Sequence, residues 1–244
     1  MSLKEKIITL KIFIADYSSR EIRILLNLFI LVTALLVFTY VAKEVVSGES
    51  KGFDEMTLNY LRHDGKIMED EQTWLTGMMI DITALGGTTI IFMITAAVVF
   101  YLLIQKQYEF MWLILIATIG GAILSFGLKE LFARERPPLI YHLLTVKSLS
   151  FPSGHAMMSS VVYLTQGALL AKVQSNKNLR VYILLVAIIL VFLIGISRIY
   201  FGVHYPTDVL AGWSVGLAWA SFCWLAVKYL QKRKVQKSKI EYQQ

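Results

Sequence analysis

The segment ILLNLFILVTALLVFTYVA, residues 24 to 42, contains no Asp, Glu, Lys or Arg. Five more uncharged runs follow along the chain: Ile82 to Ile104, Phe110 to Leu128, His155 to Ala171, Val181 to Ser197 and Val209 to Val227. Each is near the roughly 20 residues that a helix needs to cross the hydrocarbon core of a bilayer. Six such runs in a soluble protein would leave no polar outer surface. We therefore predict an all-α, polytopic membrane protein with six transmembrane helices.

The bulk composition agrees with this interpretation. The chain has 244 residues and a mean hydropathy of +0.59, with 56% hydrophobic and 17% charged residues, so it is more apolar than an ordinary soluble domain. We predict a membrane domain over residues 24–228, between a cytoplasmic amphipathic N-terminus at 1–23 and a basic cytoplasmic tail at 229–244. The first run is longer than a signal-peptide core and follows a Lys- and Arg-rich segment, so we expect it to be retained.

The basic residues predict the orientation. Fifteen of the 24 Lys and Arg residues lie in the two termini and in the joints after the second and fourth runs. Cytoplasmic segments are the ones enriched in Lys and Arg, so we expect both termini to be cytoplasmic in a cell (inner) membrane. This face suits an anionic membrane surface. No nucleic-acid partner and no obligate protein partner is expected.

Two of the runs carry small residues at four-residue spacing, and such residues share one helical face. They are Ala117, Gly121 and Ser125 in the third run and Gly212, Gly216 and Ala220 in the sixth. Small residues allow close helix packing in lipid, and a substrate groove lined by them is the alternative. The single cysteine, Cys223, is expected to pack as a small apolar residue.

Polar residues gather at the ends of four runs. The third run ends in GLKELFARERPP (127–138), where Lys129 and Arg136 are seven residues apart. This spacing predicts that they share a helix face, and that Pro137 and Pro138 then end the helix. Taken singly, such cations are also explained as interfacial anchors that extend to lipid headgroups.

The fourth run begins with PSGHAMMSS (152–160), in which Ser153 is a candidate N-cap and Gly154 leaves the first backbone amides open to a ligand. A helix N-terminus of this kind binds anions. The fifth run ends and the sixth begins within GISRIYFGVHYPTDVLAGW (195–213), which supplies Arg198, His204 and Asp208. The order of the spans puts all of these residues on the non-cytoplasmic side.

Three cations, a helix N-terminus, two histidines and a carboxylate on one surface are suited to phosphoryl transfer. Arg and Lys neutralise phosphate oxygens, and backbone amides bind the remaining lone pairs. One histidine can attack phosphorus while a carboxylate orients its ring, and the other can protonate the leaving oxygen. The sequence carries no metal-binding motif, so we expect neither a metal nor another cofactor.

The same residues form three ordered motifs. Lys129 to Pro137 fits K-x6-R-P, Pro152 to His155 fits P-S-G-H, and Ser197 to Asp208 fits S-R-x5-H-x3-D. Together they resemble the signature of the type 2 phosphatidic acid phosphatase superfamily, over roughly Asp54 to Val227. The resemblance implies that His204 is the nucleophile, that Asp208 orients it and that His155 is the general acid. It implies a phosphate site formed by Lys129, Arg136, Ser153, Gly154 and Arg198.

We therefore predict a membrane lipid phosphatase that acts through a phosphohistidine, with its active site facing the periplasm or cell exterior. Phosphatidylglycerophosphate, phosphatidic acid and undecaprenyl pyrophosphate remain alternative substrates. A lipid-linked phosphotransferase would use the same phosphohistidine. A non-catalytic lipid transporter would instead place polar residues near the bilayer midplane. The haloperoxidase relatives of the family are soluble, which disfavours that activity.

Four further features remain. The stretch from Ser47 to Thr73 interleaves charges with apolar residues and predicts an amphipathic interfacial element between the first two spans. Asp81 adjoins the second run; a charge within a span is a candidate functional group, and a cap of that helix is the favoured interpretation. His63 and His142 lie outside any motif and are expected to be loop residues without a catalytic role.

Overall fold

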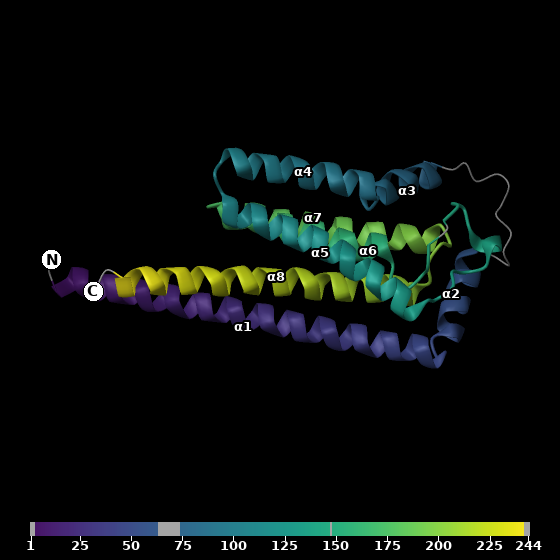
Figure 1. Cartoon of the computed structure of the whole chain (residues 1–244), viewed down its shortest axis with the longest axis horizontal. Helices are drawn as coiled ribbons and strands as arrows, with labels where there is room; N and C mark the ends of the chain where they lie inside the picture. Colours follow the sequence, from purple (N-terminus) through teal and green to yellow (C-terminus); the bar gives the residue numbers. More distant parts are fainter. Residues whose placement is uncertain (1–2, 63–73, 147, 242–244) are drawn as a thin grey trace.

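The computed structural model describes residues 3–62, 74–146 and 148–241, and these contain helices and no strand. The all-α prediction is confirmed. Figure 1 shows the elements as a bundle of long helices with the shorter α2 across one end. The elements are α1 (Leu3–Ser47), α2 (Lys51–Arg62), α3 (Trp74–Leu85), α4 (Thr88–Ile104), α5 (Tyr108–Phe132), the 3-10 helix η1 (Leu139–Tyr141), α6 (Gly154–Val173), α7 (Lys177–Tyr200) and α8 (Pro206–Glu241).

Five of the described helices are long and apolar enough to cross a membrane: parts of α1 and α8, and all of α5, α6 and α7. The short helices α3 and α4 pass the same test together and count as a sixth span if the pair crosses once. The ends of α1 and α8 lie side by side at one end of the molecule, as an even number of spans requires (Figure 1).

The second span differs from the prediction. The uncharged run Ile82 to Ile104 is not one continuous helix, because the chain bends by 49° between α3 and α4. Gly86 and Gly87 form the break, and Gly86 lies so close to α7 that an added Cβ would be 2.4 Å from the side chain of Ile194. Asp81 is exposed inside α3, so its interpretation as a helix cap is wrong.

Helix α6 lies at the centre of the bundle, with contacts to α5, α7 and α8. The small faces predicted from the sequence make these contacts. A Cβ at Gly216 would lie 2.5 Å from the carbonyl oxygen of Met157, and Gly121 faces both methyl groups of Val161. The prediction of close helix packing is therefore confirmed, and it brings the starts of α6 and α8 together.

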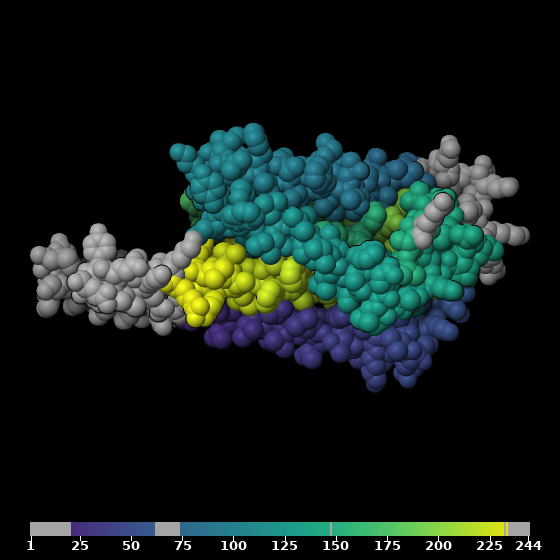
Figure 2. Space-filling model, viewed as in Figure 1, coloured from purple at the N-terminus to yellow at the C-terminus, as the bar shows by residue number. Residues whose placement is uncertain are grey.

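The end of α5 also differs from the prediction. The helix stops at Phe132, before the prolines, and Ala133 adopts the left-handed conformation with φ 44°. Arg136 therefore lies in the loop from 133 to 153, and it does not share a helix face with Lys129. This early stop turns the chain back over the ends of the other helices. Figure 2 shows the loop, in teal and green, covering that end of the molecule.

The predicted interfacial element, Ser47 to Thr73, contains the helix α2. Residues 63–73 of this element lie outside the described part of the chain. One face of α2 packs against the protein and buries Asp54 and Leu58, which are each 1% exposed. The other face leaves apolar side chains exposed: Phe53, Met56, Tyr60 and Leu61. The helix is therefore amphipathic, and a carboxylate lies on its protein-facing side.

Candidate active site

The predicted site residues all lie at the end of the bundle that is covered by α2 and the 133–153 loop (Figure 1). Lys129 is in the last turn of α5, His155 is in the first turn of α6, Arg198 is in the last turn of α7, and Asp208 is in the first turn of α8. His204 lies in the turn between α7 and α8. Residues from four helix ends therefore meet, as the order of spans predicted.

His204 and Asp208 form a buried pair. They are 2% and 0% exposed, and the distance from His204 Nδ1 to Asp208 Oδ2 is 3.4 Å. The other ring nitrogen, Nε2, lies 3.1 Å from Nη1 of Arg136. Guanidinium groups only donate hydrogen bonds, so Nε2 presents its lone pair to this arginine and the proton lies on Nδ1. The nitrogen that can attack an electrophile therefore faces the cations of the site.

Burial also sets the protonation state of His204. It lowers the pKa of the ring well below its usual range, and the hydrogen bond and charge of Asp208 offset this only in part. The imidazole is therefore neutral at physiological pH. A neutral ring keeps the lone pair on Nε2 available for nucleophilic attack.

Arg136 is held from several directions, by two backbone carbonyls and one side-chain hydroxyl. Its Nε donates to the carbonyl of Ser148, its Nη1 to that of Val203 and its Nη2 to the Ser148 hydroxyl. Burial lowers the pKa of Arg136 from the usual arginine value. Lys129 is anchored in a similar way, with its Nζ donating to the carbonyl of Leu149 at 2.5 Å. Both cations are thus fixed by the loop that the early end of α5 makes possible.

Arg198 is only 3% exposed, and its Nη1 donates to Thr83 Oγ1 of α3 at 2.8 Å. An interfacial anchor would extend to the headgroups, so that alternative is wrong for Arg198. Its Nε and the hydroxyl of Ser153 are buried, and neither has a hydrogen-bond partner in the described part of the chain. Buried polar atoms almost always have partners, so two unpaired donors fit an anion site.

Ser153 occupies the N-cap position of α6, but its side chain makes no cap hydrogen bond. Ser153 therefore lies at the N-cap position, as predicted, but the described contacts include no hydrogen bond from its side chain to the first turn of α6. Gly154 follows, and a Cβ there would lie 3.7 Å from Cε of Lys129. The N-terminus of α6 thus opens beside this lysine, in the geometry of an anion site.

His155 is half-buried, and three cations act on it electrostatically: Arg198, Arg136 and Lys129. The same two arginines act on His204, so both histidines share one group of cations. The bend between α3 and α4 packs on His155, because a Cβ at Gly86 would lie 3.1 Å from Cδ2 of its ring. His142 lies just after η1 in the loop, and His63 falls outside the described residues.

Sequence reasoning missed three residues of the site. The hydroxyl of Ser150 donates to Asp208 Oδ2 and lies 3.4 Å from His204 Nδ1. Arg134 donates to Asp208 Oδ1 at 2.6 Å and to Asp54 Oδ2 at 2.8 Å. Burial alone would lower the pKa of Arg134, but the two carboxylates raise it. Arg134 falls between motif positions, and no local signal marked Asp54, which lies 80 residues earlier.

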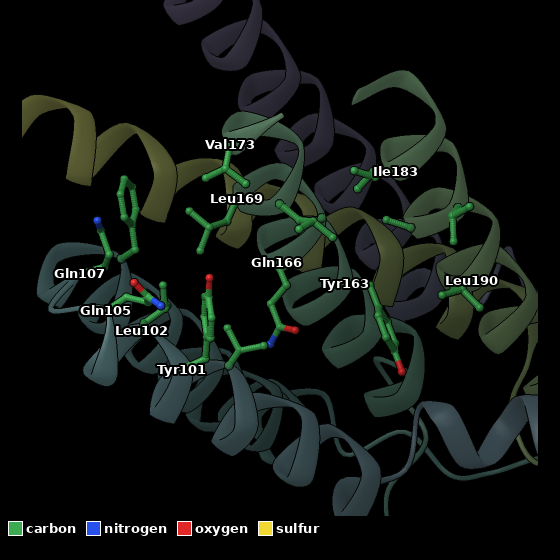
Figure 3. Close-up of a pocket in the computed structure, with 16 residues that line it drawn as sticks. Tyr101, Leu102, Gln105, Gln107, Tyr163, Gln166, Leu169, Val173, Ile183 and Leu190 are labelled. Carbon is green, nitrogen blue, oxygen red and sulfur yellow. The ribbon is translucent and has the colours of Figure 1, made fainter. Parts of the chain in front are cut away.

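An apolar cavity lies away from this site. It has a volume of about 570 Å³ and is formed by the second half of α4, the second half of α6 and the first half of α7. Figure 3 shows Tyr101, Leu102, Gln166 and Leu169 around it. It contains none of the motif residues, and its mostly apolar walls lie toward the other end of the bundle. No group of three or more His, Cys, Asp or Glu side chains within the described ranges could hold a metal ion.

The bond from Arg198 to Thr83 generates a prediction about anion binding. We expect Thr83→Val to weaken the binding of vanadate about tenfold, because a buried guanidinium loses an acceptor that orients it. Titration calorimetry on the purified protein measures this change. Thr95→Val is the matched control, since the Thr95 hydroxyl is buried and has no partner among the described residues. Equal vanadate affinities of Thr83→Val and Thr95→Val would contradict the assignment of Arg198 to an anion site.

Comparison with known proteins places this geometry in a family. The model of the PAP2 superfamily matches residues 109–232. Phosphatidylglycerophosphatase B of Bacillus subtilis (strain 168) is 37% identical over 156 residues, or 60% of this chain and 72% of that protein. Undecaprenyl-diphosphatase of Sulfolobus acidocaldarius is 30% identical over 153 residues, or 61% of this chain and 68% of that protein.

A solved structure agrees with these matches. The crystal structure of a transmembrane PAP2 type phosphatidylglycerolphosphate phosphatase from Bacillus subtilis superposes with a TM-score of 0.72 at 27% identity. The superposition covers 83% of this chain and 96% of that one. The resemblance inferred from the three motifs is therefore confirmed. The chain belongs to the PAP2 superfamily and is a membrane-bound lipid phosphatase.

Proposed function

We propose that the enzyme hydrolyses a phosphorylated membrane lipid through a phosphohistidine on His204. The observation that carries this proposal is the orientation of the ring, with Nδ1 beside Asp208 and Nε2 beside Arg136. Attack of Nε2 forms a nitrogen–phosphorus bond and breaks the bond from phosphorus to the lipid oxygen. Asp208 then stabilises the positive charge that develops on the ring.

In this proposal the phosphate is bound by the side chains of Lys129, Arg136 and Arg198 and by Ser153 and Gly154 at the start of α6. The unpaired donors of Arg198 and Ser153 support it, because phosphate oxygens accept hydrogen bonds. Three cationic side chains can balance the charge of the transition state, so we propose that no bound metal is required.

His155 completes the reaction as general acid. It gives a proton to the departing lipid oxygen, and in the second step it takes a proton from the water that hydrolyses the phosphohistidine. The support for this role is the position of His155 in the first turn of α6, beside the cations that also act on His204.

The lipid chemistry of the substrate follows from the surroundings of the site. Phosphatidylglycerophosphate, phosphatidic acid and undecaprenyl pyrophosphate all combine a phosphate with a long apolar tail. The exposed apolar face of α2 lies at the same end of the bundle as the site (Figure 1). A lipid can thus keep its tail in the bilayer while its phosphate reaches His204.

We further propose that this end faces the periplasm or cell exterior and that both termini are cytoplasmic, next to anionic lipid. The support is the distribution of charge, since fifteen of the 24 Lys and Arg residues fall in segments assigned to the cytoplasmic side.

The function is tested by measuring phosphate release from the three lipids with wild-type protein and two histidine variants. We expect wild-type activity to persist in EDTA and His204→Ala to lose more than about a thousandfold, because the nucleophile is removed. His142→Ala is the control, since this histidine has no proposed role. If His204→Ala keeps its activity within about tenfold of wild type, His204 is not the nucleophile. Loss in EDTA that one divalent ion restores would overturn metal independence.

The role of His155 is tested by varying the leaving group. An alkoxide leaving from phosphatidic acid needs a proton, whereas phosphate leaving from a pyrophosphate tolerates its charge. We expect His155→Ala to slow phosphoenzyme formation from phosphatidic acid by about 10² to 10⁴. The loss should be much smaller with an isoprenyl pyrophosphate, measured as single-turnover rates. An equal loss with both substrates would make His155 a phosphate ligand.

The orientation is tested with single cysteines in a Cys223→Ser background. Leu139→Cys lies in the loop at the active-site end, and Ser175→Cys lies in the joint between α6 and α7 at the other end; both positions are exposed. In intact cells, an impermeant maleimide should label only Leu139→Cys, and Ser175→Cys should react after lysis. The opposite pattern would reverse the proposed orientation.

A further inference from the structure

Arg134 lies between two buried carboxylates from distant parts of the chain. Its Nη1 donates to Asp208 Oδ1 at 2.6 Å and its Nη2 donates to Asp54 Oδ2 at 2.8 Å. Both carboxylates are at most 1% exposed, and the arginine side chain is 14% exposed. This arrangement links the amphipathic helix α2 to the carboxylate beside His204 through one side chain.

Neighbouring groups fix the three side chains in place. The Thr207 hydroxyl donates to Asp54 at 2.7 Å, and its backbone N–H donates to the other oxygen of the same carboxylate. The guanidinium carbon of Arg134 lies 4.3 Å from the centre of the Tyr205 ring. The planar guanidinium therefore has a defined orientation, with one nitrogen for each carboxylate.

The two oxygens of Asp208 have separate partners. Oδ1 accepts from Arg134, while Oδ2 accepts from Ser150 and from the backbone N–H of Tyr205 and faces Nδ1 of His204. The bond from Arg134 thus sets the rotation of the carboxylate. This rotation keeps Oδ2 directed at the histidine ring.

The charges explain why a second carboxylate is needed. A guanidinium paired with Asp208 alone would cancel the negative charge that stabilises His204 when its ring becomes positive. Asp54 supplies a compensating negative charge on the far side of Arg134. The group of Asp54, Arg134 and Asp208 then keeps a net charge of −1 next to His204.

We propose that Arg134 and Asp54 are positioning residues for the phosphoryl-transfer reaction: Arg134 holds the catalytic carboxylate in register, and Asp54 preserves its charge. The proposal rests on the phosphohistidine mechanism proposed above. It makes α2 part of the active site, since the helix contributes Asp54 to the charged group. A second bond holds α2 to the loop, from the Tyr141 hydroxyl to Asn59 Oδ1 at 2.6 Å.

The experiment compares Asp54→Asn, Arg134→Gln and the double variant, with single-turnover rates of phosphohistidine formation as the readout. We expect Asp54→Asn to slow the step about 10- to 100-fold with KM nearly unchanged, because the lost stabilisation exists only in the transition state. Adding Arg134→Gln to Asp54→Asn removes the uncompensated positive charge. Arg134→Gln alone should also slow the step, because Asp208 loses the bond that sets its rotation. If Asp54 acts through Arg134, the two losses are not additive, and the double variant should be no slower than Arg134→Gln alone.

Glu135→Gln is the matched control, because it removes one negative charge from an exposed position next to Arg134. It should react at the wild-type rate. Asn has nearly the volume of Asp, so Asp54→Asn decides the question even if Arg134→Gln does not fold. Thermal unfolding of each purified variant separates loss of folding from loss of rate.

Two results would overturn the proposal. One is an unchanged rate in Asp54→Asn with only a lower unfolding temperature, which would make the three residues a structural tether. The other is a double variant that shows the full product of the two single losses, which would mean that Asp54 does not act through Arg134. Failure of the phosphohistidine mechanism has a separate signature, because wild-type protein would then form no phosphohistidine, or His204→Ala would remain active.

Discussion

The carboxylate of Asp208 is the point at which the separate parts of this chain become one site. Its oxygens accept hydrogen bonds from Ser150 and Arg134 of the loop and from the backbone of Tyr205. The backbone carbonyl oxygen of Asp208 also accepts a hydrogen bond from the backbone N–H of Ser153, and this bond joins the starts of α6 and α8. A fully buried carboxylate is costly unless such donors surround it. The stability of this end of the fold and the orientation of His204 therefore depend on the same contacts.

Helix packing determines where these groups can meet. Gly212 and Gly216 allow α8 to approach the backbone of α6, and a Cβ at Gly212 would lie 2.7 Å from the carbonyl oxygen of Ser153. Larger residues would separate the two helices and lengthen the distance from the start of α6 to Asp208. The small-residue faces therefore act on the site through geometry, although neither glycine is among the proposed phosphate-binding groups.

The sequence allowed much of the site to be predicted because alternating spans bring fixed ends together. Lys129, His155 and Arg198 lie at helix ends that share a side, so their proximity followed from the number and order of the spans. The residues that were missed depend on local or long-range contacts that leave no such pattern. Helix α5 ends at Phe132 because Ala133 adopts the left-handed conformation with φ 44°. The contact from Asp54 to Arg134 spans 80 residues. The break at Gly86 was hidden because it lies inside an uncharged run.

The electrostatics of the site favour the state in which an anion is bound. Lys129, Arg136 and Arg198 repel one another, and burial removes much of the water that would screen them. The negative charge of Asp208 offsets only part of this positive charge, because Asp208 is also paired with Arg134. Asp54 in turn balances the charge of Arg134. A dianionic phosphate relieves the repulsion, and the relief grows as negative charge collects on the equatorial oxygens during transfer. In the proposed mechanism, the cations bind the ground state through its charge and the transition state more strongly, while the neutral His204 adds no positive charge until it has attacked.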